Sequence, residues 1–306
     1  MKNKIKNNIL IYFSFIILLV ILVVNASSFI KQDIINKERR TSYRESVLLS
    51  CENDSQYKIT YEKLCKGMKE NEQPTSDFYY MLYNINNFGY RFLSFSLFLF
   101  ILIPAFVYGE RNLRNRTIIN SYNREGFIKY KKRLFRETYK ASLILPLIGV
   151  ISIIICYIYS GSFVPKLIQD GGFYWKLSEM NKPFIFCVLY VLNIFIRSLL
   201  FCNIVLIILK KKYNYFVSII LSFLSIYVIE LILEIFVSIV IVQNLLHLEF
   251  GLIFNIIDFF SFSSQFGFAT CMIVPTLLLI ITSLIVKKIY KNKEKFIIDC
   301  EKIDRS

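Results

Sequence analysis

Residues 109–140 read GERNLRNRTIINSYNREGFIKYKKRLFRETYK and separate two long apolar runs, residues 92–108 and 141–160. This basic stretch contains ten Lys or Arg residues and only three Glu residues. Short loops of this composition between membrane spans remain on the cytoplasmic side of the bilayer. The stretch therefore predicts a membrane-spanning chain and also predicts which way that chain is oriented.

The composition of the whole chain agrees with a membrane location. Its 306 residues are 55% hydrophobic, the mean hydropathy is +0.51, and the apolar residues form runs long enough to cross a bilayer. A net charge of +15 could suit nucleic acid, but Lys and Arg gather at the ends of apolar runs, where they flank a membrane. We therefore expect the lipid bilayer, and not nucleic acid, as a partner. The abundance of Lys, Asn and Ile is typical of an AT-rich bacterial genome.

Six apolar segments predict an all-α polytopic membrane protein with six transmembrane helices, which form a single transmembrane domain over residues 1–306. The segments are residues 9–24, 92–108, 141–160, 183–209, 215–242 and 267–286. The first segment follows a basic start and precedes small residues, which is also the pattern of a cleaved signal peptide. We favour a retained span because the later spans pair well with it. Residues 243–265 are predicted to lie in, or re-enter, the outer edge of the bilayer.

The distribution of basic residues orients these spans. Of the 37 Lys and Arg residues, 23 fall in the start of the chain, the basic stretch, the lysines 210–212 and the tail 287–306. This places both termini in the cytoplasm, at a bacterial plasma membrane. Residues 30–88 then lie outside as a polar, partly helical extracellular insertion between the first and second spans, and the basic and acidic residues of this segment balance.

The insertion holds the one pair of cysteines that lies in a polar segment, Cys51 and Cys65. A disulfide between them would be compatible with an extracellular location and would stabilise the segment by ~3 kcal/mol through loop entropy. Two free thiols are the alternative. The seven cysteines contain no CxxC motif, and His247 is the single histidine, so the sequence predicts no metal site.

Three charged residues lie deep in the predicted spans: Arg197, Glu230 and Glu234. Each costs at least ~2.5 kcal/mol in a bilayer unless it is paired or hydrated. Helix rise places Arg197 and Glu230 at a common level, ~20 Å from the cytoplasmic ends of their helices, and Glu234 one turn further out on the same face. We expect an intramembrane charge pair that holds the fourth and fifth spans together. A polar lining for a substrate path is the alternative.

Motifs of membrane enzymes are missing from the sequence. There is no HExxH, no GxSxG to accompany His247, no pair of aspartates within the spans and no GxxxxGK[ST] nucleotide loop. The chain is therefore not expected to be an enzyme or to hold a cofactor, and any ATP-driven work would require a separate polypeptide.

The order of features around the basic stretch carries a family resemblance. The second span runs into Glu110, and then come Arg116-Thr117, a short segment at residues 118–120, Arg124 and the basic cluster at residues 129–132. This order resembles the membrane subunits of bacterial ABC-2-type transporters, in which a glycine occupies the position of Arg116. The segment 196–201, followed by the lysines 210–212, is also similar to permeases of this group.

The resemblance implies a permease subunit that pairs with a second permease subunit, as a homodimer or heterodimer, to form the substrate pathway of an exporter. A separate ABC ATPase subunit would bind the ATP and move the spans through a coupling helix in the cytoplasmic coupling loop, residues 109–140. The substrates would be peptides, antibiotics or lipids. The residues implied in coupling to the ATPase are Glu110, Arg114, Arg116, Thr117 and Ile118.

Other interpretations of the same segments remain open. Residues 127–140 have a broad apolar face that we expect to lie along the membrane. A solvated loop that only sets topology is the alternative to coupling, and the length of the loop beyond the minimum for a turn favours coupling. The protein could also be a non-transport membrane protein, such as an immunity factor or a sensor whose insertion binds an extracellular ligand. A secondary transporter that uses Arg197 and Glu230 is a third class, although no internal repeat supports it.

Overall fold

The computed structural model of the chain describes residues 2–53, 62, 65, 78–86, 97–114, 126–163, 182–210, 215–245, 256–257, 259–260 and 268–291. All regular elements in these ranges are helices, and none of the residues within them forms a strand. The predicted all-helical fold is therefore confirmed.

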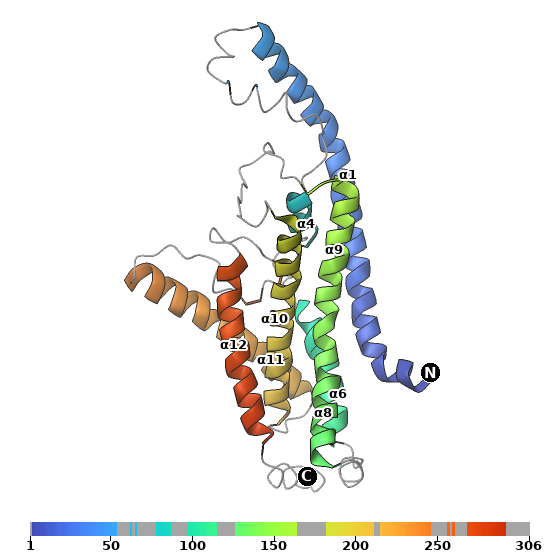
Figure 1. Ribbon diagram of the computed structural model, residues 1–306, viewed down its shortest axis with the longest axis vertical. Coiled ribbons are helices and arrows are strands. Elements are labelled where there is room, and N and C mark those ends of the chain that lie inside the picture. Colours follow the sequence, from blue (N-terminus) through green and yellow to red (C-terminus); the bar gives the residue numbers. More distant parts are fainter. Residues whose placement is uncertain are drawn as a thin grey trace.

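Long apolar helices make up most of the fold (Figure 1). Their bounds are α1 (Lys2–Asn53), α4 (Phe78–Asn86), α6 (Leu99–Arg114), α8 (Phe127–Tyr139), the 3-10 helix η1 (Lys140–Leu143), α9 (Ile144–Ser160), α10 (Pro183–Leu209), α11 (Tyr215–Leu231), the π-helix η3 (Ile232–Leu245) and α12 (Phe268–Ile289). Five stretches are long and apolar enough to cross a membrane: Ile9–Asn53, Phe127–Ser160, Pro183–Leu209, Phe216–Val240 and Cys271–Ile289. These helices are compatible with a multi-pass membrane protein.

The second predicted span, residues 92–108, is only partly covered by the structure. Its apolar helical part is Leu99–Glu110, which is shorter than a full membrane crossing, and residues 87–96 lie outside the described ranges. Helix α6 continues without a break past Glu110 to Arg114. The start of the basic stretch is therefore an extension of this helix rather than a separate element.

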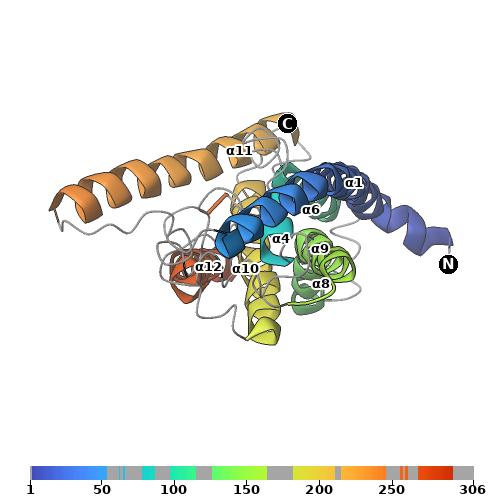
Figure 2. The same ribbon diagram turned by 90° about the horizontal axis from the view of Figure 1, so that it is seen from above.

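Helix α10 lies at the centre of the bundle, with α6, α9 and α12 packed around it (Figures 1 and 2). Fully buried aromatic side chains fill the space between these helices. Phe201 of α10 lies between Phe98, next to the start of α6, and Phe259, with ring centroids 5.7 and 5.1 Å away. Gly149 allows α9 to approach α10 closely, because a Cβ atom there would meet Ile194 Cδ1 at 2.7 Å. Small residues at such contacts permit tight helix packing in a membrane.

Helix α1 is one continuous helix of 52 residues that runs along the bundle and then extends beyond it (Figure 1). Leu18 and Leu22 are buried in the main core, and Tyr159 of α9 donates a hydrogen bond to Asp33 Oδ2 at 2.9 Å. Beyond this point the helix carries Cys51, which is bonded to Cys65 by a disulfide with a Cα–Cα distance of 6.1 Å. The helical character expected for the start of the insertion is therefore present.

Helices α8, η1 and α9 form one helical unit, Phe127–Ser160. The expectation that residues 127–140 lie along the membrane surface is wrong. The apolar face of α8 packs on protein instead, where Tyr130 and Leu134 form a small buried cluster with Leu206, Val286 and Tyr290. The physical reason is that the ends of α10 and α12 supply an apolar surface which covers this face.

Candidate functional site

Four polar side chains are buried in the middle of α10, between residues 193 and 203. Asn193, Arg197, Ser198 and Asn203 are each at most 2% exposed, although the rest of this helix is apolar. Polar groups buried among apolar helices are costly without hydrogen bonds, and such residues in membrane spans mark functional or structural contacts. The buried polar region of α10, defined by these residues, is therefore the candidate functional site.

Arg197 is the largest fully buried side chain among the described residues. Its Nε donates a hydrogen bond of 3.1 Å to Asn193 Oδ1, one turn earlier on the same helix. The Asn193 amide nitrogen is itself buried, and no described residue accepts a hydrogen bond from it. Together these groups place a cation and an amide donor deep inside the bundle.

Glu230 of α11 is 6% exposed and anchors a segment that the sequence placed near the bilayer edge. Its Oε2 accepts a hydrogen bond of 2.8 Å from the backbone N–H of Ile256. Phe259 and Phe260 of the same segment are buried; the Phe259 ring meets Phe201 of α10 edge-on, and the Phe260 ring is tilted against Tyr190 of α10. The described residues 256–257 and 259–260 therefore lie among the helices. The predicted pairing of Glu230 with Arg197 stays a prediction.

Glu234 does not share the environment of Glu230. The sequence placed the two carboxylates on one face of a regular helix, but Glu234 is exposed while Glu230 is buried. The helix changes at Ile232 from α to π hydrogen bonding. Positions four residues apart still lie near one side of a π-helix, so this change does not separate the two carboxylates. The common face stays a prediction, and the difference in exposure shows only that Glu230 is covered by other residues whereas Glu234 is not.

A hydrogen-bond cluster joins α4, α9 and α10 near the Asn193 end of the buried polar region. Asn86 donates from Nδ2 to the Tyr190 hydroxyl at 3.0 Å, and its Oδ1 accepts from the Ser152 hydroxyl at 3.0 Å. The amide of Asn86 thus bridges two long helices. Such interhelical bonds contribute ~0.6 kcal/mol each in membrane proteins.

A second cluster joins α8, α10 and α12 near the other end. Asn203 Oδ1 accepts a hydrogen bond from the Tyr139 hydroxyl, and its Nδ2 donates to Thr282 Oγ1 at 3.1 Å and to Ser283 Oγ at 2.9 Å. We call this group the Asn203 hub. It connects the basic helix α8 directly to two spans. Sequence reasoning missed the hub, although an asparagine inside an apolar span is a usable signal because its amide requires partners.

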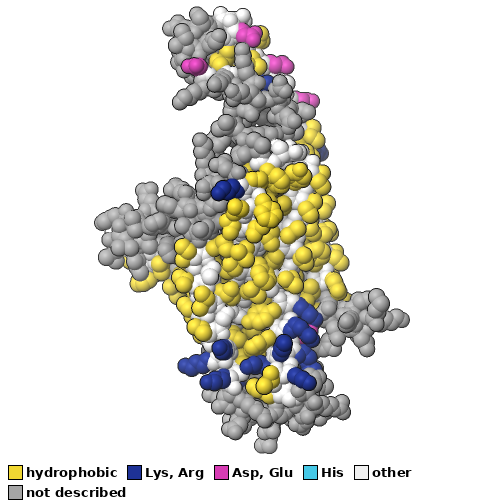
Figure 3. All heavy atoms as spheres, in the orientation of Figure 1, with side chains coloured by type: hydrophobic (Ala, Val, Ile, Leu, Met, Phe, Trp, Pro, Cys, Tyr) yellow, Lys and Arg dark blue, Asp and Glu magenta, His cyan; other side chains and the backbone are white. Residues whose placement is uncertain are grey.

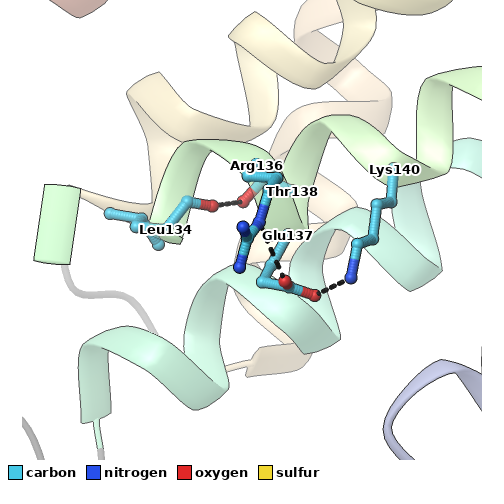
Figure 4. Close-up of polar contacts among 5 residues, drawn as sticks. All are labelled: Leu134, Arg136, Glu137, Thr138 and Lys140. Atoms are coloured by element: carbon cyan, nitrogen blue, oxygen red, sulfur yellow. Dashed lines mark hydrogen bonds and ion pairs between the residues drawn. The ribbon is translucent and has the colours of Figure 1, made fainter. Parts of the chain in front are cut away.

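Basic side chains gather at the end of the bundle where α8 begins and α12 ends (Figure 3). On α8, Glu137 lies between two of them (Figure 4): Lys140 Nζ is 2.5 Å from Oε2, and Arg136 Nε is 3.5 Å from Oε1. Acidic side chains gather at the opposite tip, around the outer part of α1 (Figure 3). The two ends of the molecule therefore differ in charge as the basic stretch predicted.

The residues implied in coupling are only partly placed by the structure. Glu110 is half-buried within α6, and Arg114 is the last residue of that helix. Arg116, Thr117 and Ile118 lie outside the described residues. Close packing precedes them, since a Cβ atom at Gly109 would meet Leu209 Cδ1 at 2.3 Å. The end of α6 is therefore in tight contact with the end of α10.

The described residues contain no group of three or more His, Cys, Asp or Glu side chains that could hold a metal ion. Comparisons of the chain with protein-family models, with curated proteins and with solved structures found no match.

Proposed function

We propose that this chain is the membrane-spanning permease subunit of an ATP-driven ABC exporter in a bacterial plasma membrane. It has six spans, both termini are cytoplasmic, and residues 30–88 form the extracellular insertion. The Asn203 hub supports this proposal best, because it ties the basic helix α8 to the spans that carry buried polar groups. A force applied to the cytoplasmic loop would therefore reach α10 and α12.

The partner that supplies this force is a separate ABC ATPase, which binds and hydrolyses the ATP. The coupling residues are Glu110, Arg114, Arg116, Thr117 and Ile118. Support comes from α6, which continues as a helix past the apolar region and is packed tightly on α10 at Gly109. A rigid extension of this kind transmits displacement better than a solvated loop does.

A second permease subunit covers α11 and η3. This long apolar helix projects away from the bundle (Figure 2), and Phe216, Leu231 and Phe236 are each more than half exposed. Glu234 is also exposed among these apolar side chains. A carboxylate facing lipid is costly, whereas a facing protein chain can provide hydrogen bonds. This favours contact with another subunit along α11 and η3.

The experiment that tests the proposal is co-purification. An ATPase with a nucleotide-binding loop, encoded beside this chain, should purify with the full-length protein from detergent extracts. Replacement of residues 114–118 by Gly and Ser should abolish that association, whereas Gly/Ser replacement of five residues in the extracellular insertion, 69–73, should leave it intact. If the variant with residues 114–118 replaced still binds the ATPase, the assignment of these residues to coupling is wrong.

A sensor with an extracellular insertion is the second candidate, and the outward extension of α1 favours it. This helix runs well beyond the bundle (Figure 1). Near its far end, Cys51 is joined to Cys65 by a disulfide. Stimulation of the ATPase rate by the reconstituted chain would favour the exporter. An unchanged rate would favour the sensor.

A further inference from the structure

One face of the helical unit formed by α8, η1 and α9 changes from basic to apolar at a sharp boundary. The face can be followed at helical spacing along the whole unit. Its basic half contains Lys129, Lys132, Arg136 and Lys140, and its apolar half contains Leu143, Leu147, Val150, Ile154 and Ile158. The apolar members are 39–75% exposed. We call this face the α8–α9 stripe.

The apolar half of the stripe faces lipid if α9 crosses the membrane, because no described element covers it. Leu143 then marks the edge of the hydrocarbon region. In the 3-10 helix η1, side chains three residues apart eclipse one another, so Lys140 lies directly below Leu143. The axial distance from Leu143 is ~6 Å for Lys140 and ~12 Å for Arg136.

These distances place the two cations beside lipid headgroups. The headgroup layer of one leaflet is ~5–7 Å thick, and long basic side chains extend back toward the interface. Lys132 and Lys129 lie ~18 and ~22 Å from Leu143, beyond this layer. Only Arg136 and Lys140 are therefore within reach of a headgroup whose acyl chains cover the apolar half.

Glu137 holds this pair of cations together. Its carboxylate contacts both Arg136 and Lys140, and the three side chains carry a net charge of +1 (Figure 4). The Arg136 side chain remains 69% exposed and that of Lys140 35% exposed, so both have donors available to a further anion. Arginine and lysine donors together favour a phosphate group.

We infer that Arg136 and Lys140 bind the headgroup phosphate of an anionic phospholipid in the cytoplasmic leaflet, while its acyl chains lie along Leu143, Leu147 and Val150. A lipid fits better than an acidic protein because the cations directly continue a lipid-facing apolar surface. A protein in solution would meet Lys129 and Lys132 first. The inference requires that α9 spans a membrane with α8 on the cytoplasmic side, and it holds whether or not the chain is a permease.

Native mass spectrometry of the full-length chain in detergent tests the inference. Phosphatidylglycerol and phosphatidylcholine with identical acyl chains are added at equal concentration, and the lipids retained are counted. We expect several-fold greater retention of phosphatidylglycerol. Arg136→Gln with Lys140→Gln should remove that preference, whereas Lys129→Gln with Lys132→Gln, which removes the same charge, should keep it.

One further variant and one competitor cover the remaining outcomes. Glu137→Gln should increase retention of phosphatidylglycerol, a gain that misfolding would not produce. Glycerol phosphate, which lacks acyl chains, should not displace the lipid, and displacement would instead identify a site for free phosphate. Equal losses in the two double variants would show unspecific attraction and overturn the inference. If the variant with both Arg136 and Lys140 replaced still prefers phosphatidylglycerol, the inference is overturned too. The two cations would then be available to bind an acidic protein surface instead.

Discussion

Helix α10 and the helix formed by α11 and η3 have similar apolar sequences but opposite positions in the molecule. In its most apolar stretch, 67% of α10 is buried, whereas the corresponding value for α11 and η3 is 22%. Polar groups of α10 are hydrogen-bonded to α4, α8 and α12, while η3 projects from the bundle (Figure 2). Apolarity alone does not distinguish the two, because lipid chains and apolar side chains are equivalent surroundings for a span. The two helices differ instead in their polar residues, because α10 contains four polar side chains that are buried in the bundle, among them Arg197 and two asparagines.

The largest difference between the two helices should come from aromatic truncation. Phe201→Ala on α10 removes a ring that is fully buried between Phe98 and Phe259. We expect a loss of ~3 kcal/mol in the free energy of unfolding because a cavity remains. Phe236→Ala on η3, where the ring is 58% exposed, should change stability by less than ~0.5 kcal/mol. Unfolding by dodecyl sulfate in mixed micelles measures both, and equal losses would contradict the assigned burial.

The next largest effect should come from the Asn203 hub. Asn203→Leu keeps the side-chain volume but removes hydrogen bonds to Tyr139, Thr282 and Ser283. We expect a loss of ~2 kcal/mol, since each interhelical bond contributes ~0.6 kcal/mol and the buried partners are left unsatisfied. Asn244→Leu on η3, where the side chain is exposed, is the matched control and should have little effect. The same mixed-micelle titration measures both variants. An unchanged free energy of unfolding for Asn203→Leu would show that the Asn203 hub does not stabilise the packing of the three helices.

A smaller effect is expected from an added methyl group. Gly149→Ala brings a Cβ atom to 2.7 Å from Ile194 Cδ1, so the fully buried Ile194 side chain must move. We expect a loss of ~1 kcal/mol from overpacking. Val228→Ile adds one carbon atom to an exposed position of α11 and should be neutral. Melting temperatures in detergent would show the difference, and an unchanged value for Gly149→Ala would mean that the two helices separate without strain.

The smallest effect on the stability of one subunit should come from Glu234→Gln. The carboxylate is exposed on η3, so its removal should change unfolding by less than ~0.5 kcal/mol. If a second subunit covers this helix, however, the dimer fraction measured by cross-linking should fall. Glu52→Gln, which removes an exposed carboxylate from the outer part of α1, is the control. A dimer fraction that stays constant would show that α11 and η3 face lipid.

Particular residues show how far the sequence could predict this fold. Apolar runs located five long helices, and the polar surroundings of Cys51 and Cys65 singled out a pair that the structure joins. Periodicity did not predict that Glu234 is exposed while Glu230 is buried, because that difference depends on which positions of the helix other elements cover. It also failed for residues 127–140, whose apolar face could have been covered equally well by lipid or by protein.

The sequence by itself determined the helical class, the apolar spans and the concentration of basic residues at one end, because these depend on the composition of contiguous segments. Only the tertiary structure decided that α10 is central, that Asn203 joins three helices and that Tyr130 and Leu134 pack on α12. These contacts join residues far apart in the chain, and many partners of equal apolarity compete for them. Shape and hydrogen bonding select among those partners, and both appear only when the helices are packed.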